Sequence, residues 1–77
     1  MKTREEIKAM NHEELYDFLR QDRRLTEEEF IAVKNHKLVD NYTFWTRVGN
    51  VREYTVEILK PNLNIYADVD ISVKDEE

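Results

Sequence analysis

Strict alternation of apolar and polar residues near the C-terminus is the strongest constraint on what this chain can fold into. Every odd-numbered residue from 63 to 73 is apolar, whereas the even-numbered positions hold Asn64, Tyr66, Asp68, Asp70 and Ser72. Successive side chains of a β-strand point to opposite faces, so this period of two predicts a strand with one buried and one solvated face.

Two more strands are predicted upstream. Residues 51–59 place Tyr54, Val56 and Ile58 on one side, and residues 41–48 are rich in aromatic and β-branched side chains. Gly49 and Asn50 are typical of a two-residue hairpin. That hairpin pairs position 48 with 51, 46 with 53, 45 with 54 and 44 with 55.

The second turn is predicted at Pro61 and Asn62. Pairing position 60 with 63 then sets 58 opposite 65, 56 opposite 67, and 54 opposite 69. A slip by one residue would turn polar side chains into the core. The buried face is therefore expected to hold Trp45, Tyr54, Val56, Ile58, Ile65, Ala67, Val69 and Ile71.

The N-terminal half carries three capping boxes. Thr3, Asn11 and Thr26 are each followed three residues later by a glutamate, the pattern in which cap and glutamate satisfy each other's backbone amides. Helices are predicted over 4–10, 12–21 and 27–37, each with apolar residues at spacings of three and four. The fold class is therefore α+β, with three short N-terminal helices packed on a three-stranded antiparallel β-meander (αααβββ).

Length and composition limit the function classes. The 77 residues predict a single domain over 1–77, with a helical half (1–38), a sheet (41–74) and an acidic tail (75–77). The net charge is −5, and residues 38–77 carry 8 acidic but only 4 basic side chains, which disfavours direct nucleic-acid binding. The chain has no cysteine, no apolar run long enough for a membrane span and no signal-peptide core, so we expect a cytoplasmic protein.

The predicted register fixes the outer sheet face by elimination. That face would carry Tyr42, Phe44, Thr46, Glu53, Thr55, Glu57, Tyr66, Asp68 and Asp70. None of these positions is basic, and Glu53 would stand opposite Asp70, an unfavourable pairing of like charges. Aromatic rings beside the acids favour a binding surface, although a solvated sheet face is ordinarily polar as well.

Other candidate sites are weaker. His12 and His36 lack a metal-ligand spacing, so neither a metal nor any other cofactor is expected. Arg20, Arg23 and Arg24 precede a helix that begins with three glutamates, which would repel DNA phosphates. No nucleophile elbow, phosphate loop or shielded carboxylate pair is apparent, so no catalytic residue is expected and the protein is predicted not to be an enzyme.

The chain resembles the small, acidic, cysteine-free early proteins with which phages take over bacterial hosts. The resemblance lies in the character of the whole chain and in its opening, Met1-Lys2-Thr3-Arg4-Glu5-Glu6. Some proteins of that group mimic DNA and block DNA-binding proteins, including histone-like HU proteins. The resemblance implies a partner that is a basic, nucleic-acid-binding host protein, bound in the host cytoplasm.

These observations favour a non-enzymatic inhibitor that occupies the nucleic-acid-binding surface of that partner. The expected partner-binding residues are Glu53, Glu57, Asp68, Asp70, Phe44, Tyr42 and Tyr66. An alternative is a general protein–protein interaction module that binds through its helical half, by the Arg20–Arg24 loop or by Leu38 and Val39. Homodimerisation through the free edge of the Leu63–Val73 strand is a third possibility, so a monomer and a homodimer both remain open.

Overall fold

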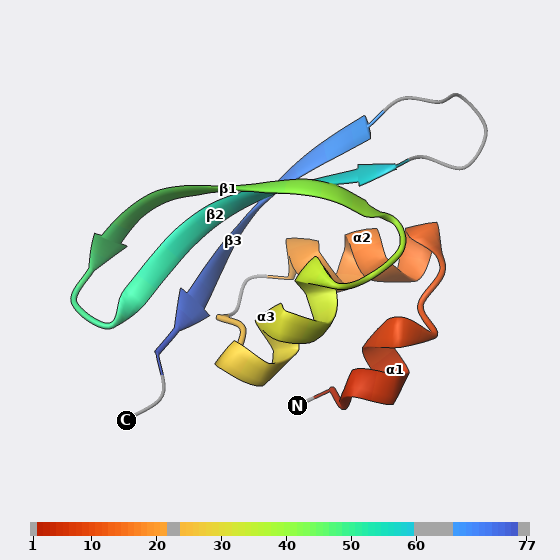
Figure 1. The fold of residues 1–77 in the computed structure, drawn as a ribbon, viewed down its shortest axis with the longest axis horizontal. Coiled ribbons are helices and arrows are strands. Elements are labelled where there is room, and N and C mark those ends of the chain that lie inside the picture. The colour runs from red at the N-terminus through yellow and green to blue at the C-terminus, as the bar shows by residue number, and fades with distance from the viewer. Residues whose placement is uncertain (1, 22–23, 60–65, 76–77) are drawn as a thin grey trace.

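A computed structural model describes residues 2–21, 24–59 and 66–75 of the chain. Three helices precede three strands: α1 (Arg4–Lys8), α2 (His12–Arg20), α3 (Glu27–Lys34), β1 (Val39–Val48), β2 (Val51–Leu59) and β3 (Tyr66–Lys74). The strands form one antiparallel sheet in the order β1-β2-β3, and the helices lie together on one of its faces (Figure 1). The predicted α+β class and the order of its elements are confirmed.

All three predicted capping boxes are present. The side chains of Thr3, Asn11 and Thr26 each accept from a backbone N–H of the first turn, and the glutamate at that position accepts from the cap in return. The backbone hydrogen bond from Thr3 holds the pKa of Glu6 below its ordinary value. The helices end earlier than predicted, and α3 gives way to a turn in which the His36 amide bonds the Val33 carbonyl.

The β1–β2 hairpin begins as predicted but departs from the predicted regular register at two places, between Phe44 and Thr46 and between Val39 and Asn41. Gly49 has φ 62°, as a tight hairpin requires, and Val48 pairs with Val51. The register then shifts between Phe44 and Thr46, so that Phe44, not Trp45, lies opposite Tyr54. The extra residue reverses the alternation of faces from there to Asn41. Consequently Trp45 is 65% exposed, and its predicted place in the core is wrong.

The β2–β3 register differs from the prediction by two residues. Val56 lies opposite Val69 and Tyr54 opposite Ile71, where Ala67 and Val69 were expected. A shift of two preserves the inner and outer faces, because the side-chain period is also two. The apolar alternation therefore fixed the faces but not the partners. The predicted turn at Pro61-Asn62, the pairing of Lys60 with Leu63 and the core position of Ile65 lie outside the described residues.

The core lies between the helices and the inner face of β2 and β3. It includes Ile7, Leu15, Phe18, Leu19, Leu25, Phe30, Val33, Tyr54, Val56, Ile58, Val69, Ile71 and Val73, each no more than 8% exposed. The short α1 packs against α3. Its attachment is strengthened by the buried Glu29, whose carboxylate accepts from the backbone amides of Lys2 and Thr26.

The segment before α3 runs beside β3. The Leu25 amide donates to the Ser72 carbonyl at 2.8 Å, and the Lys74 amide donates to the Leu25 carbonyl at 2.9 Å. This short parallel bridge occupies the end of the β3 edge. The prediction that the Leu63–Val73 strand has a free edge is therefore wrong for that end of the strand.

Candidate protein-binding surface

The outer face of the sheet, on the side away from the helices, brings together all four predicted acidic residues. Its cross-strand rows are Asn41–Glu57–Asp68, Thr43–Thr55–Asp70 and Thr46–Glu53–Ser72, with Trp45 in the bulge beside them. We call these residues and Tyr66, which begins β3, the acidic face. These rows hold no lysine or arginine, and the adjoining row toward the hairpin, Val48–Val51–Lys74, places one exposed lysine at the end of the same face.

Like charges do oppose each other on the acidic face, but not in the predicted pair. Glu53 lies opposite Ser72, and Asp70 lies opposite Thr55, so the expected Glu53–Asp70 pair is wrong. The two-residue shift instead sets Glu57 opposite Asp68. Directly opposed side chains have Cβ atoms about 5 Å apart, where like charges destabilise a sheet.

Trp45 is joined to the carboxylates by a chain of hydrogen bonds. Its indole N–H donates to Thr55 Oγ1, and the Thr55 hydroxyl donates to Asp70 Oδ1 at 2.7 Å. Both bonds hold exposed groups in fixed positions, so a large ring stands beside an oriented carboxylate. Sequence reasoning missed Trp45 because the uninterrupted hairpin register turned it inward. The alternation of Tyr42 and Phe44 in step with the inner face was the signal for a bulge.

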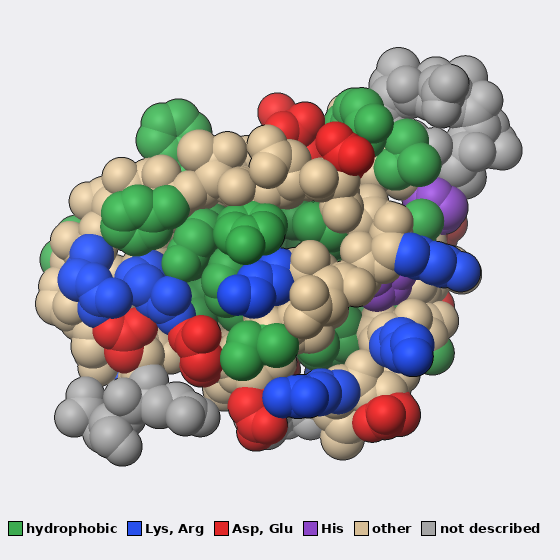
Figure 2. Space-filling model, in the orientation of Figure 1, with side chains coloured by type: hydrophobic (Ala, Val, Ile, Leu, Met, Phe, Trp, Pro, Cys, Tyr) green, Lys and Arg blue, Asp and Glu red, His purple; other side chains and the backbone are tan. Residues whose placement is uncertain are grey.

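Tyr42 and Phe44 do not belong to the acidic face, and their predicted placement is wrong. They lie opposite the inner-face residues Val56 and Tyr54. Tyr42 makes an edge-to-face contact with Phe30, with ring centroids 5.8 Å apart, and Phe44 contacts Tyr54 at 5.6 Å. Figure 2 shows hydrophobic side chains gathered between the sheet and the helices, with basic side chains beside them.

Tyr66 remains on the acidic face as predicted. It pairs with Leu59 at the start of β3 and is 46% exposed. Asp68 is two residues further along β3 and therefore points to the same face as Tyr66. The Tyr66 ring thus flanks the Glu57–Asp68 pair. The two exposed rings of the acidic face are therefore Trp45 and Tyr66.

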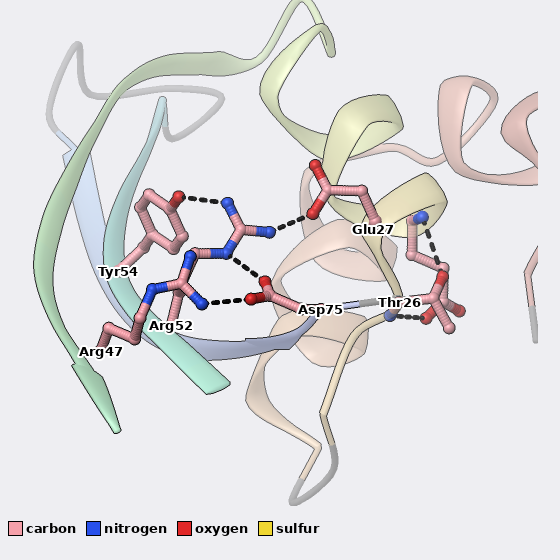
Figure 3. Close-up of polar contacts among 7 residues, drawn as sticks. Thr26, Glu27, Arg47, Arg52, Tyr54 and Asp75 are labelled. Carbon is pink, nitrogen blue, oxygen red and sulfur yellow. Dashed lines mark hydrogen bonds and ion pairs between the residues drawn. The ribbon is translucent and has the colours of Figure 1, made fainter. Parts of the chain in front are cut away.

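Arg52 organises a polar cluster on the opposite, helix-facing side of the sheet (Figure 3). Its guanidinium donates to Tyr54 Oη at 2.9 Å and to Glu27, and its Nε lies 2.8 Å from Asp75 Oδ1. Burial tends to lower the pKa of Arg52, but the charge of Glu27 contributes most to the opposing effect, and the pKa is raised.

Asp75 belongs to this cluster rather than to an acidic tail. Arg47 donates to its carboxylate, and this hydrogen bond is the main cause that lowers the pKa of Asp75 below its ordinary value. The charge of Asp75 is thus offset by two arginines within the fold. The remaining predicted tail residues, Glu76 and Glu77, lie outside the described residues.

The histidine and arginine residues considered from the sequence make contacts within the fold or line its surface. His36 is 4% exposed, accepts from the Leu38 amide through Nδ1 and therefore donates from Nε2 to the Met10 carbonyl. Within residues 2–21, 24–59 and 66–75, no group of three or more His, Asp or Glu side chains could hold a metal ion. Arg20 and Arg24 line an open depression together with Asp70, whereas Arg23 lies outside the described residues.

Comparisons with protein-family models, curated proteins and solved structures found no significant match. No helix in the described part of the chain has the length and apolar character needed to cross a bilayer.

Proposed function

We propose that this chain is a non-enzymatic, acidic protein-binding inhibitor that uses the acidic face to occupy a basic surface of another protein. The observation that carries this proposal is the grouping of Glu53, Glu57, Asp68 and Asp70 in three adjacent cross-strand rows of one sheet face, with Lys74 as the basic side chain of the next row. Charge complementarity of this kind mainly raises the association rate and sets specificity.

The opposed Glu57–Asp68 pair supports a binding role over a merely solvated surface. A sheet gains nothing in stability from like charges at directly opposed positions. A basic partner would place positive charge between them and turn this repulsion into attraction. The repulsion between Glu57 and Asp68 is therefore present in the free protein and relieved in the complex.

Trp45 and Tyr66 provide the apolar part of the interface. Tryptophan and tyrosine are enriched among the residues that dominate binding energy. Trp45 replaces Phe44 and Tyr42 as the aromatic anchor, because the bulge turns those two rings toward the helices. We expect the rings to set the lifetime of the complex and the carboxylates to set its salt dependence.

The finer form of the proposal is mimicry of DNA toward a basic, nucleic-acid-binding protein of a bacterial host, such as a histone-like protein. Asp68 and Asp70 are two residues apart on one strand face, about 7 Å by strand rise. This distance is of the order of the spacing between successive phosphates along a nucleic-acid strand.

The test is a pull-down from nuclease-treated bacterial lysate with the tagged chain, read by mass spectrometry. The wild type should retain a basic nucleic-acid-binding protein at low salt and lose it at moderate salt or when DNA is added. Asp68→Lys/Asp70→Lys should abolish retention. Glu13→Lys/Asp17→Lys, which makes the same charge change on the exposed side of α2, should retain the partner.

A neutral, salt-resistant partner that both double variants retain equally would contradict the proposal. The alternative, a general interaction module that binds through its helical half, would then take precedence. Arg20→Glu/Arg24→Glu would test it, because that variant reverses the charge on the helical side of the depression that Asp70 also lines and substitutes no residue of the acidic face.

A further inference from the structure

β1 is a long sheet edge with no strand beside it. The sheet order leaves one side of β1 without a partner among the described residues, and every residue from Asp40 to Val48 is exposed. We infer that the β1 edge binds the β1 edge of a second copy of this chain, in antiparallel orientation, to form a continuous six-stranded sheet. The inference does not depend on the proposed binding of a basic partner.

The two sheet edges differ in how they are protected. The β3 edge is bridged by Leu25 at its Ser72–Lys74 end. β1 carries neither proline nor lysine, two residues that commonly block edge pairing. The register of β1 shifts at both ends of the strand, between Val39 and Asn41 and between Phe44 and Thr46, so the run from Asn41 to Phe44 is the part that pairs regularly with β2 and offers a template.

Exposed aromatic rings cluster in the middle of this edge. Tyr42 is 42% exposed and Phe44 is 53% exposed on the helix side of β1, and Trp45 is 65% exposed on the other side. The side chains of a second strand beside β1 would cover the exposed sides of these rings, on the helix side of the sheet and on the opposite side. A two-fold axis through the middle of the strand would bring the rings of the two copies together.

The charges of β1 are arranged for antiparallel self-pairing. Asp40, near the start, and Arg47, near the end, are the only charged residues of the strand. Antiparallel pairing brings the Asp40 end of each copy to the Arg47 end of the other, twice in a symmetric dimer. Arg47 already contacts Asp75, but about half of its side chain (49%) remains exposed. Parallel pairing would instead bring like charges together.

The acidic faces of the two copies would not prevent this association. Their carboxylates lie on β2 and β3, and the two β2 strands of the dimer would be three strand spacings apart, about 14 Å. The Debye length at physiological ionic strength is about 8 Å, so this repulsion is largely screened. Pairing would join the two acidic faces into one extended surface.

The experiment measures mass by light scattering and sedimentation over a wide range of concentration at physiological salt. The wild type should show a concentration-dependent monomer–dimer equilibrium. Asp40→Arg and Arg47→Asp should each raise the dimer Kd by about tenfold or more, because each replaces two opposite-charge contacts by two like-charge contacts. Asp17→Arg on α2, which changes the net charge as Asp40→Arg does, should leave the Kd unchanged.

Mixing the two single variants provides the decisive arm. In an antiparallel pair, the Asp40→Arg chain presents two positive ends and the Arg47→Asp chain two negative ends, so the mixture should form heterodimers from two predominantly monomeric solutions. Phe44→Glu should weaken dimerisation in the wild-type background, with folding checked by circular dichroism. A wild type that stays monomeric at every concentration, or variants that fail to associate when mixed, would overturn the inference.

Discussion

Replacing Asp68 by lysine should stabilise the fold while it weakens binding, because Asp68 faces Glu57 across β2 and β3. The substitution changes a directly opposed like-charge pair into an opposite-charge pair. Cross-strand pairs contribute about 0.2–1 kcal/mol, and like charges cost a similar amount. Removing the repulsion and adding the attraction should therefore raise the free energy of unfolding by about 1 kcal/mol.

For a chain of this size, 1 kcal/mol corresponds to a rise in Tm of about 4–8 °C. Thermal and urea unfolding, followed by circular dichroism at low salt, would measure it. Concentrated salt should shrink the difference, because surface charges are screened within a few ångströms at high ionic strength.

The matched control is Asp70→Lys, two residues along the same strand. Asp70 lies opposite Thr55 and accepts its hydroxyl at 2.7 Å, so this variant removes a hydrogen bond and relieves no opposed carboxylate. It should be neutral or slightly destabilising. If both variants changed the stability equally, or if Asp68→Lys destabilised the chain at low salt, the assigned register and the repulsion between Glu57 and Asp68 would be refuted.

Three further predictions concern other parts of the fold. His36→Ala should lower the free energy of unfolding by about 2–4 kcal/mol in urea titrations, because it leaves a buried carbonyl and a buried amide without their partner and opens a void; a loss below about 1 kcal/mol would contradict these contacts. Asp75 has a lowered pKa in the fold, so its ion pairs stabilise above its ordinary pKa of 3.8 and are lost as the pH falls further. Asp75→Asn should therefore lower stability at neutral pH but reduce the loss on acidification, and an unchanged acid unfolding profile would argue against the Arg47 contact. Finally, the fluorescence of Trp45, the only tryptophan, should be red-shifted and readily quenched by iodide, whereas a blue-shifted, protected emission would place it in the core.

Local signals predicted the helical half well. The capping boxes fixed the three helix starts because each depends on only four consecutive residues. The helix ends were less determined, since no glycine or proline terminates them, and the residues after α1 and α3 are instead held by the bonds of His36 to the Met10 carbonyl and the Leu38 amide.

The faces of β2 and β3 were predictable from the sequence, whereas the pairing of these strands and the faces of β1 were not. The alternation in β3 correctly assigned Val69 and Ile71 to the core, but alternation is unchanged by a two-residue shift, so it did not distinguish the predicted pairing from the observed one. The bulge at Trp45 arose from a conflict. The Gly49-Asn50 hairpin, continued without interruption, would place Tyr42 and Phe44 on the outer face. Their contacts with Phe30 and Tyr54 favour the helix-facing side instead, and the bulge accommodates both.

The acidic residues of the candidate site were identified because the shift preserved their face, whereas its aromatic members changed. Tyr66 stayed, Tyr42 and Phe44 moved to the helix side, and Trp45 took their place. The acidic character of the face was therefore inferred correctly from the sequence, but the residues that lie opposite one another on it were not.

Competition with DNA tests the central claim most directly. A labelled DNA duplex bound to a purified histone-like protein would be titrated with the chain, and release would be followed by fluorescence anisotropy at low and moderate salt. We predict that the wild type releases the duplex at low salt, that Asp68→Lys/Asp70→Lys does not, and that Glu13→Lys/Asp17→Lys behaves as the wild type. Equal release by all three proteins, or none by the wild type, would contradict the proposal that the acidic face occupies such a protein's DNA-binding surface.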